Sequence, residues 1–304
     1  MPRVNIVVPA YNAEAFIADT VRSALAQTAP DLQVTVIDDG SKDATARQAS
    51  IDDARVRVIS QENRGMSRSR NRGVAEVDSE FVALLDADDL WHPEKLRLQL
   101  EALQSLPDHD FCYTGFTWWY SEPMPGYFQE PRSGRIDETL SGWIYPHLIL
   151  DNHALPSSVL WRRSAWDRMG GFLTDNQQTD DWEYLVRAST QHRFVRLAES
   201  FVLYRQHPVS LSKRIPATNT TELMRTELIR RFGMSSPPGH DVDPVALRDF
   251  QHKGWCNFAD AHCAKGDLGL GLRTFARLLR EGPHRGLTLT KMGKSLFRRW
   301  VPND

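Results

Sequence analysis

Four short apolar runs near the start of the chain predict β-strands. They are rich in Val, Ile and Leu, and they cover residues 4–9, 34–39, 56–60 and 81–86. An amphipathic segment follows each run and predicts a helix, near residues 13–26, 43–50, 66–77 and 93–105. Alternation of this kind predicts βαβ units and a largely parallel sheet. Because the runs are apolar almost throughout, helices are expected to cover both faces of that sheet.

The order of elements is less regular in the next hundred residues. The run "DFCYTGFTWWY" and the shorter "SSVLW" look like strands, and "QTDDWEYLVRASTQ" looks like a helix. Residues 121–139 form a Pro- and Gly-rich segment, whose length is typical of a functional loop rather than a plain connection. The pattern as a whole predicts an α/β, Rossmann-like protein with a mostly parallel but mixed sheet.

Strand patterns stop near residues 210–215, and helical patterns continue from there to the end of the chain. The segment "ADAHCAKGDLGLGLRTFARLLREGP" predicts a helical hairpin that turns at residues 265–267. We therefore expect an α/β domain and a separate helical C-terminal region. The expected bounds are 1–212 for the α/β domain, with halves at about 1–106 and 107–212, and 213–304 for the helical region.

Composition narrows the class of protein. The chain has 304 residues, of which 41% are hydrophobic and 25% charged, with a formal net charge of −2, so nucleic acid is not an expected partner. Its three cysteines, Cys112, Cys256 and Cys263, lack the spacing of a zinc site or a disulfide framework, which favours a reducing compartment. No run of 18 apolar residues occurs. We expect a soluble, cytoplasmic protein.

Charge is unevenly distributed, because residues from 271 onward hold eight Arg or Lys and only two acids. Residues 286–301 mix these basic side chains with large apolar ones. The residues concerned are Leu287, Leu289, Leu296, Phe297, Trp300, Lys291, Lys294, Arg298 and Arg299. Such a segment could make peripheral contact with the inner face of a membrane. The alternative is a short helix that packs on the catalytic domain with its basic residues outward.

Polar clusters follow three of the predicted strands, where the carboxyl ends of parallel strands bind ligands. After the first two strands stand "PAYN" and "DDGSKDAT". An exposed carboxylate of Asp38 or Asp39 could accept the imide N–H of a uracil or thymine, or a ribose hydroxyl, beside a flat apolar surface from Pro9 and Tyr11. The alternative role, in a turn and a helix cap, explains Gly40 and its neighbours but not two consecutive aspartates.

The third cluster, "DADD", holds Asp86, Asp88 and Asp89. Crowded carboxylates raise one another's pKa unless a cation neutralises them, and hard oxygen ligands favour Mg²⁺ or Mn²⁺. A divalent ion that bridges to a diphosphate is therefore expected at Asp86 and Asp88. Asp89 is expected to cap the helix that follows.

The segment "ENRGMSRSRNRG" supplies basic side chains near a predicted helix start, where anions bind. Its arginines are Arg64, Arg68, Arg70 and Arg72. Arg can pair with phosphate, but a solvated basic face is the expected role for two of the four. The spacing does not tell which two.

"TDDWEYLVRAS" predicts a helix with three acids at its start. With Asp180 as the N-cap, Glu183 completes a capping box, and Asp181 is left in the first turn. There the helix dipole keeps Asp181 ionised and able to take a proton from an acceptor hydroxyl. His207, just past a strand-like segment, is either a metal ligand or a structural histidine.

These residues resemble the inverting glycosyltransferases of family 2, which have the GT-A fold. The resemblance covers roughly residues 3–212 and rests on seven motifs in sequence order. They are "NIVVPAYN", "VIDDGSKDAT", "ENRGMSRSRNRG", "FVALLDADDLWHPEKL", "GGF", "DDWEYLVR" and "YRQH".

The resemblance implies transfer of a sugar from a nucleoside diphosphate donor to a hydroxyl group, with inversion. It also implies roles for individual residues. Pro9, Tyr11 and Asp39 are implied to hold the nucleoside, and Arg70 to lie by the nucleotide. Asp86 and Asp88 would form the DxD pair, with Asp88 chiefly ligating the metal, and Asp181 would be the general base. The pair before the helix tryptophan is often Glu-Asp in the family and is Asp180-Asp181 here, so Asp180 also remains a candidate.

The expected partners are a nucleotide sugar, with a UDP-sugar favoured, and a glycan, lipid-linked or other hydroxyl acceptor. The expected cofactor is Mn²⁺ or Mg²⁺. Two alternatives are a nucleotidyltransferase that makes a sugar nucleotide and a non-catalytic carbohydrate-binding protein. The first would have a Gly-rich phosphate loop near the N-terminus, which "PAYNAEAF" lacks, and the second would have lost Asp88 or Asp181.

Overall fold

The computed structural model describes residues 2–120, 126–174, 179–207 and 214–300. The chain forms two compact units. The sheet unit comprises Met1–Leu148 and Asn152–His207, and the helical unit comprises Ile149–Asp151 and Pro208–Asp304. Residues 121–125 of the predicted loop, and residues 208–213 near the predicted domain boundary, lie outside the described residues.

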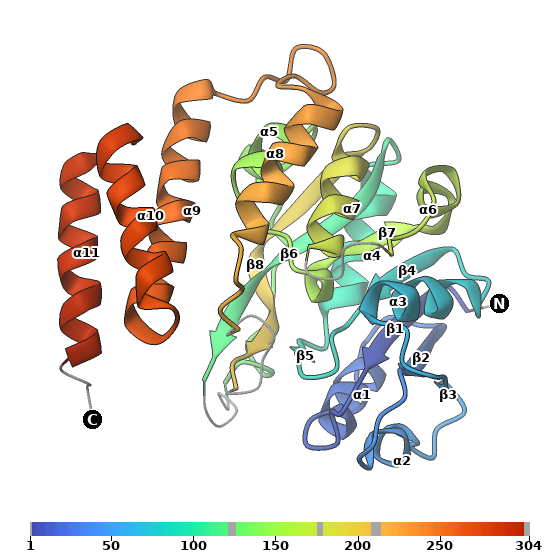
Figure 1. The fold of residues 1–304 in the computed structure, drawn as a ribbon. Coiled ribbons are helices and arrows are strands. Elements are labelled where there is room, and N and C mark those ends of the chain that lie inside the picture. The colour runs from blue at the N-terminus through green and yellow to red at the C-terminus, as the bar shows by residue number, and fades with distance from the viewer. Residues whose placement is uncertain (1, 121–125, 175–178, 208–213, 301–304) are drawn as a thin grey trace. The chain divides into compact units, whose positions relative to one another are not determined.

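The sheet unit is built on one mixed sheet in the order β3-β2-β1-β4-β7-β6-β8-β5 (Figure 1). Its strands are β1 (Val4–Ala10), β2 (Leu32–Asp38), β3 (Val56–Ser60), β4 (Phe81–Leu84), β5 (Leu90–Trp91), β6 (His109–Trp119), β7 (Leu160–Arg162) and β8 (Arg193–Arg205). Strands β1 to β4 pair in parallel, as do β6 and β8. Strand β7 is antiparallel to both β4 and β6, and β5 is antiparallel to β8. The predicted mixed sheet is thus confirmed.

Helices cover both faces of this sheet, as predicted. They are α1 (Ile17–Leu25), α2 (Thr45–Ala49), α3 (Met66–Ala75), α4 (Lys95–Ser105), α5 (Tyr145–Leu150), α6 (Arg163–Met169) and α7 (Asp180–Ser189). Because side chains alternate along a strand, Val4, Ile6 and Val8 of β1 point into one core with α1 and α4. Asn5 and Val7 point to the other face, where the Asn5 side chain donates to the carbonyl of Gly73 in α3 at 3.0 Å.

A glycine sets how closely α3 approaches the sheet. A Cβ at Gly73 would lie 2.3 Å from Cγ1 of Val7 and 3.3 Å from Cγ1 of Ile37, so any larger residue would push α3 away from β1 and β2. Helix α3 also carries three of the four arginines that the sequence singled out, Arg68, Arg70 and Arg72. The position of that helix therefore depends on the absence of a side chain at residue 73.

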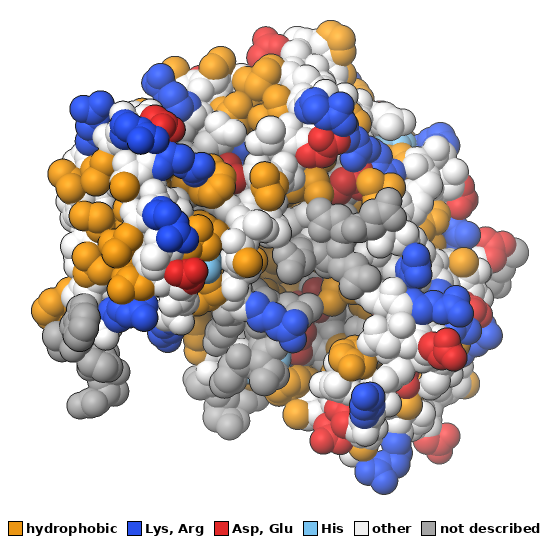
Figure 2. All heavy atoms as spheres, in the orientation of Figure 1, with side chains coloured by type: hydrophobic (Ala, Val, Ile, Leu, Met, Phe, Trp, Pro, Cys, Tyr) orange, Lys and Arg blue, Asp and Glu red, His pale blue; other side chains and the backbone are white. Residues whose placement is uncertain are grey.

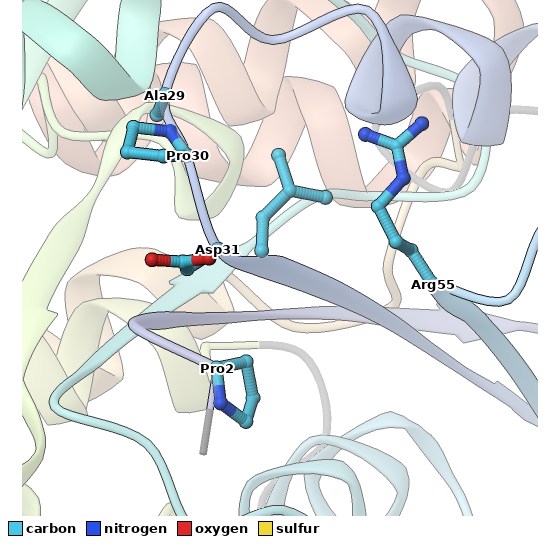
Figure 3. A pocket seen from close by; sticks show the side chains of 6 residues that line it. Pro2, Ala29, Pro30, Asp31 and Arg55 are labelled. Carbon is cyan, nitrogen blue, oxygen red and sulfur yellow. The ribbon is translucent and has the colours of Figure 1, made fainter.

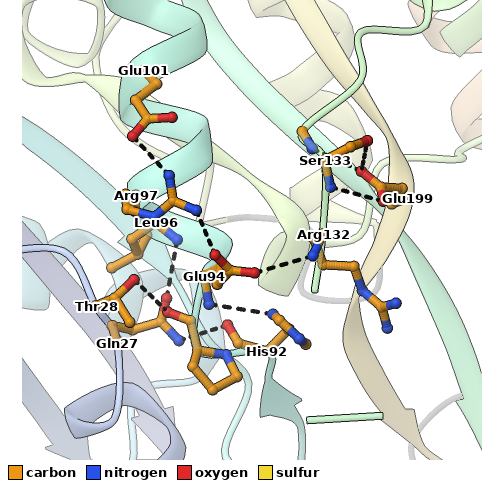
Figure 4. A network of polar contacts seen from close by, with 12 residues as sticks. Gln27, Thr28, His92, Glu94, Leu96, Arg97, Glu101, Arg132, Ser133 and Glu199 are labelled. Atoms are coloured by element: carbon orange, nitrogen blue, oxygen red, sulfur yellow. Dashed lines mark hydrogen bonds and ion pairs between the residues drawn. The ribbon is translucent and has the colours of Figure 1, made fainter. Parts of the chain in front are cut away.

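A polar network holds the segment after β6 against the sheet unit (Figure 4). Glu94, at the start of α4, accepts hydrogen bonds from Arg97 and from the backbone N–H of Arg132. The carboxylate of Glu199 in β8 accepts from the backbone and the hydroxyl of Ser133. Residues 132–133 are thereby fixed between a helix start and a strand.

The helical unit contains α8 (Thr220–Phe232), α9 (Pro244–Lys265), α10 (Leu268–Glu281) and α11 (Arg285–Trp300). Helices α9 and α10 form the predicted hairpin, and Asp267 caps α10 by accepting from the N–H of Leu270. Their core is made of Cys256, Ala259, Cys263, Phe275 and Leu278. None of the helices in the described part of the chain is long and apolar enough to cross a membrane.

The close approach at residue 73 gives a testable prediction. Gly73→Ala should lower the free energy of unfolding by about 1–3 kcal/mol, because the new methyl group overpacks the contact with Val7. Urea unfolding followed by circular dichroism measures this change. Gly293→Ala is the matched control: a Cβ there meets nothing within 4 Å, so the same change in helix α11 should stabilise by about 1 kcal/mol. Equal effects of the two variants would contradict the packing argument.

Candidate active site

The carboxyl ends of β1, β2 and β4 meet at one edge of the sheet. Ala10 pairs with Asp38 in register, and the N–H of Asp39 donates to the carbonyl of Ala10 at 2.8 Å. Strand β4 lies on the other side of β1, so the segment of Asp86 to Asp89 leaves the same edge. The three polar clusters of the sequence are therefore brought to one place.

The loops after β1 and β2 are tied together by reciprocal hydrogen bonds. The N–H of Asn12 donates to Oγ of Ser41 at 2.9 Å, and the N–H of Lys42 donates to Oδ1 of Asn12 at 2.9 Å. Pro9 is buried within β1, whereas Tyr11 is 49% exposed. Of the apolar surface expected from Pro9 and Tyr11, only the Tyr11 ring is open to solvent.

Asp38 and Asp39 are buried, which corrects the expectation of an exposed carboxylate at this position. Oδ1 of Asp38 accepts from the N–H of Ser41 at 3.2 Å. The Asp39 side chain accepts from the N–H groups of Arg64 and Gly65, at 2.9 and 2.8 Å, and from Nε2 of Gln61 at 2.7 Å. Asp39 is 4% exposed, and it fixes the loop that leads into α3.

Arg70 is a buried cation at this edge of the sheet, and it binds two of the acidic side chains. Its side chain is 2% exposed, and its guanidinium donates from Nη1 to Asp180 at 3.0 Å and from Nη2 to Asp86 at 3.1 Å. Burial opposes its charge, but Asp180, Asp86 and Asp181 together raise the pKa of Arg70 above its ordinary value. The cation thus joins the end of β4 to the start of α7.

The "GGF" motif holds a ring against this arginine. Cζ of Arg70 lies 5.5 Å from the centre of the Phe172 ring. Asn71 of α3 fixes Phe172 by accepting from its N–H at 2.8 Å and donating to its carbonyl at 2.9 Å. A Cβ at Gly171 would lie 2.5 Å from Oδ1 of Asn71, so a larger residue would break this pairing.

Asp89 does not cap the following helix, contrary to prediction. Helix α4 begins at Lys95 after Glu94, and Asp89 lies fully buried before it. Its two oxygens accept from Oγ of Ser157 at 2.6 Å and from the N–H of Arg205 at 3.1 Å. Burial, reinforced by the charges of Asp88 and Asp86, raises the pKa of Asp89 well above its usual value. Asp89 instead anchors the acidic segment to β8.

Asp88 faces His207, which follows β8. Nε2 of His207 lies 2.8 Å from Oδ2 of Asp88, and the Asp88 side chain is 28% exposed. Asp86 is 23% exposed; burial raises its pKa, while Arg70 opposes that shift. Within the described part of the chain, no three His, Cys, Asp or Glu side chains converge as a ready-made metal group. The carboxylate of Asp88, with that of Asp86 near it, fits a cation such as Mg²⁺, which typically takes one or two carboxylates and completes its shell with substrate phosphates and water.

Asp180 and Asp181 begin α7 but differ in environment. The predicted capping box is wrong, because the N-cap is Thr179 and the Asp180 carboxylate accepts from Oγ of Ser67 at 2.9 Å as well as from Arg70. Asp181 is half-buried. Burial raises the pKa of Asp181 to about 6; the charge of Arg70 opposes this rise, and the charge of Asp180 adds to it. A carboxylate with such a pKa is suited to accept a proton near neutral pH.

The sequence did not predict a role at this edge for three residues, Ser67, Ser157 and Arg205. Ser157 accepts the N–H of Asp86 at 3.0 Å while donating to Asp89, and Arg205 donates from Nε to the carbonyl of Asp88 at 2.7 Å. A signal was present for Ser67. It stands three residues before Arg70 in α3, on the face that Gly73 and Val74 mark as buried.

A shallow pocket of about 380 Å³ lies at the amino ends of the strands, not at this edge (Figure 3). It is lined by residues that precede β1 and β2 and by Arg55, including Pro2, Pro30 and Asp31. None of the predicted site residues lines it. The candidate site is therefore the polar edge formed by the carboxyl ends.

Residues 5–140 match the sequence profile of glycosyl transferase family 2. The Bacillus subtilis protein named uncharacterized glycosyltransferase EpsJ is 38% identical over 227 residues, which cover 70% of this chain and 64% of that protein. The matched regions of five further curated relatives span 24% to 68% of their lengths. Residues 5–140, a little under half of the chain, are thus similar to glycosyl transferase family 2, and these matches support a glycosyltransferase as the class of protein.

Two solved structures share the fold. TarS residues 1–349 of S. aureus, in complex with UDP-GlcNAc, superimpose with a TM-score of 0.62 at 15% identity, covering 98% of this chain and 89% of that one. The mannosyltransferase PcManGT of Pyrobaculum calidifontis, in complex with GDP-Man and Mn²⁺, gives a TM-score of 0.56 at 19% identity, covering 100% and 88%. The chain thus has the GT-A fold with a helical C-terminal region.

The buried ion pairs of Arg70 give a second prediction. Arg70→Met leaves the Asp180 carboxylate buried without its cation, which should lower the free energy of unfolding by about 3–5 kcal/mol. Arg68 lies on the same helix but is exposed, so Arg68→Met should change it by less than about 0.5 kcal/mol. Urea unfolding of both variants measures the difference. A loss below about 1 kcal/mol in Arg70→Met would mean that the pair contributes no more than an exposed one.

Proposed function

We propose that the protein transfers a sugar from a nucleoside diphosphate donor, with a UDP-sugar favoured, to a hydroxyl group of an acceptor, with inversion at the anomeric carbon. The observation that carries the proposal is the arrangement around Arg70, which joins Asp86 of the DxD segment to the helix start that bears Asp181. The nucleotide sugars bound to TarS and PcManGT support the class of donor. The acceptor is a glycan, a lipid-linked sugar or another hydroxyl compound.

The donor nucleotide is proposed to bind at the loops after β1 and β2. The exposed Tyr11 ring offers a face for the base, and each buried carboxylate of Asp38 and Asp39 retains acceptor capacity beyond its backbone bonds. Arg70, together with the helix start of α3, supplies positive charge beside the diphosphate. With the base at Tyr11 and the diphosphate beside Arg70, the sugar of the donor would lie between residues 86–89 and the start of α7.

Asp88 and His207 are the residues proposed to hold a divalent cation, with Asp86 beside them. The Mn²⁺ in the complex of PcManGT supports a cation of this kind. When bound, the ion supplies Lewis-acid stabilisation of the charge that develops on the leaving diphosphate. Because Asp86 already forms an ion pair with Arg70, Asp88 is proposed as the main carboxylate ligand of the ion.

Asp181 is proposed as the general base and Asp180 as a positioning residue. Asp180 is 3% exposed and is bonded to both Arg70 and Ser67, so it has no access to an acceptor hydroxyl. Asp181 is the more open of the pair and has a raised pKa. In a single displacement the acceptor oxygen attacks the anomeric carbon as its proton passes to the Asp181 carboxylate, and the bond to the diphosphate breaks on the opposite face.

The base assignment is tested with a panel of nucleotide sugars and Mn²⁺, following release of the nucleoside diphosphate. Asp181→Asn should lower kcat by a factor of about 10²–10⁴, because the amide cannot take the proton. Asp167→Asn is the matched control, since Asp167 is an exposed carboxylate on α6, outside this edge. If Asp181→Asn transferred at the rate of the wild type, the base would have to be sought elsewhere.

The pH dependence of kcat provides an independent test. Asp181 acts in its ionised form, so kcat should rise as the pH increases through about 6 and should be about tenfold lower at pH 5 than at its plateau. Steady-state rates with a saturating donor measure the profile. A profile that is flat from pH 5 to pH 7, in a protein that stays folded over that range, would contradict a base with a raised pKa.

A further inference from the structure

Helix α11 has an unusual distribution of side chains. The residues that it buries are small and polar, Thr288 and Ser295, while Leu287, Leu289 and Phe297 are 53%, 53% and 65% exposed. A helix that only packs on its neighbours shows the opposite pattern, with apolar residues inward. The helix therefore presents a second, apolar face to its surroundings.

The inner face is held largely by hydrogen bonds. Oγ1 of Thr288 lies 3.0 Å from Nε2 of His252, and the hydroxyl of Ser295 donates to Asp260; both partners are on α9. Met292 packs against the core of α9 and α10. These contacts fix which side of α11 faces the unit, so the exposure of the opposite side follows from the packing and not from fraying.

The outer face is centred on Phe297. At 100° per residue, Phe297, Thr290 and Gly293 form one stripe, with Leu287 and Leu289 to either side of it. A shallow depression of about 440 Å³ opens beside this stripe and is lined by Gly293, Lys294, Phe297 and Arg298. Figure 2 shows hydrophobic side chains gathered over α11, at the left of the view, with Lys and Arg beside them.

Positive charge predominates on α10 and α11. Residues 268–300, which make up α10, α11 and their connection, hold eight Arg or Lys and a single acid, Glu281. Lys294 and Arg285 on α11 are exposed, and Arg273 and Arg280 of α10 are exposed as well. An anionic partner is therefore favoured over a neutral or a cationic one.

We propose that the outer face of α11 binds the surface of an anionic phospholipid bilayer. Apolar side chains in the middle of a helix face, flanked by Lys and Arg, are typical of helices that lie in the interface of a membrane, where the rings and Leu side chains enter the acyl region and the cations meet lipid phosphates. The core of a protein interface is instead depleted of Lys. The side chain of Trp300 and residue 301, which the sequence also suggested for this contact, lie outside the described residues.

Cosedimentation of the full chain with lipid vesicles tests this proposal. Vesicles that contain phosphatidylglycerol should bind the wild type, and added salt should weaken that binding, whereas vesicles of phosphatidylcholine alone should bind it poorly. The triple variant L287S/L289S/F297S should bind the anionic vesicles at least about tenfold more weakly. Circular dichroism should show an unchanged fold, because all three side chains are exposed.

The matched control is L223S/V245S, which removes two apolar side chains of similar exposure, 55% and 57%, from α8 and α9. This control should bind the anionic vesicles as the wild type does. Equal binding by the triple variant and the wild type, or equal binding to neutral and anionic vesicles, would overturn the proposal. The proposal would also be overturned if the wild type did not bind vesicles but formed a dimer, and the triple variant did not form it. The outer face of α11 would then join two copies of the chain. Release of nucleoside diphosphate in solution reports separately on the proposed transfer.

Discussion

The ion pairs of Arg70 are the interaction on which the candidate site depends. A guanidinium that is 2% exposed needs carboxylates to compensate for its lost hydration. It takes one from the segment that follows β4 and one from α7, which lie far apart in the sequence. Burial raises the pKa of Asp86, and the contact with Arg70 opposes that rise. The cation and its partners therefore set the position of the donor-side acids relative to the proposed base.

The surroundings of Arg70 are built to keep it in place. Gly73 lets α3 lie against β1, Ser67 of the same helix shares the Asp180 carboxylate, and Asn71 holds Phe172 beside the guanidinium. On the other side, Asp89 and Ser157 fix the segment that carries Asp86 and Asp88. Several groups that touch no substrate in the proposed mechanism thus hold in place those that do, as expected for a preorganised site.

The first half of the fold could be predicted because its signals are local. Apolar runs and amphipathic repeats located β1 to β4 and α1 to α4 to within a few residues. Strand β8 was predicted only as a strand-like segment just before His207. Its first half, with Arg193, Arg196 and Glu199, lacks an apolar run and is held by pairing with β6. Partners such as Ser157 for Asp89 could not be predicted, because 68 residues separate them and only the tertiary fold brings them together. For the same reason a local pattern suggested caps for Asp89 and Asp180, and both were wrong.

The central claim is that Asp88, with His207, holds a cation that binds the diphosphate of a nucleotide donor at the edge organised by Arg70. Titration calorimetry of UDP and of GDP, with and without Mn²⁺, tests it most directly in the wild type, in Asp88→Asn and in the control Asp167→Asn. The account predicts that one of the nucleotides binds, that its binding requires Mn²⁺, and that Asp88→Asn abolishes it while Asp167→Asn does not. Nucleotide binding that is independent of Mn²⁺ and unchanged in Asp88→Asn would contradict the account.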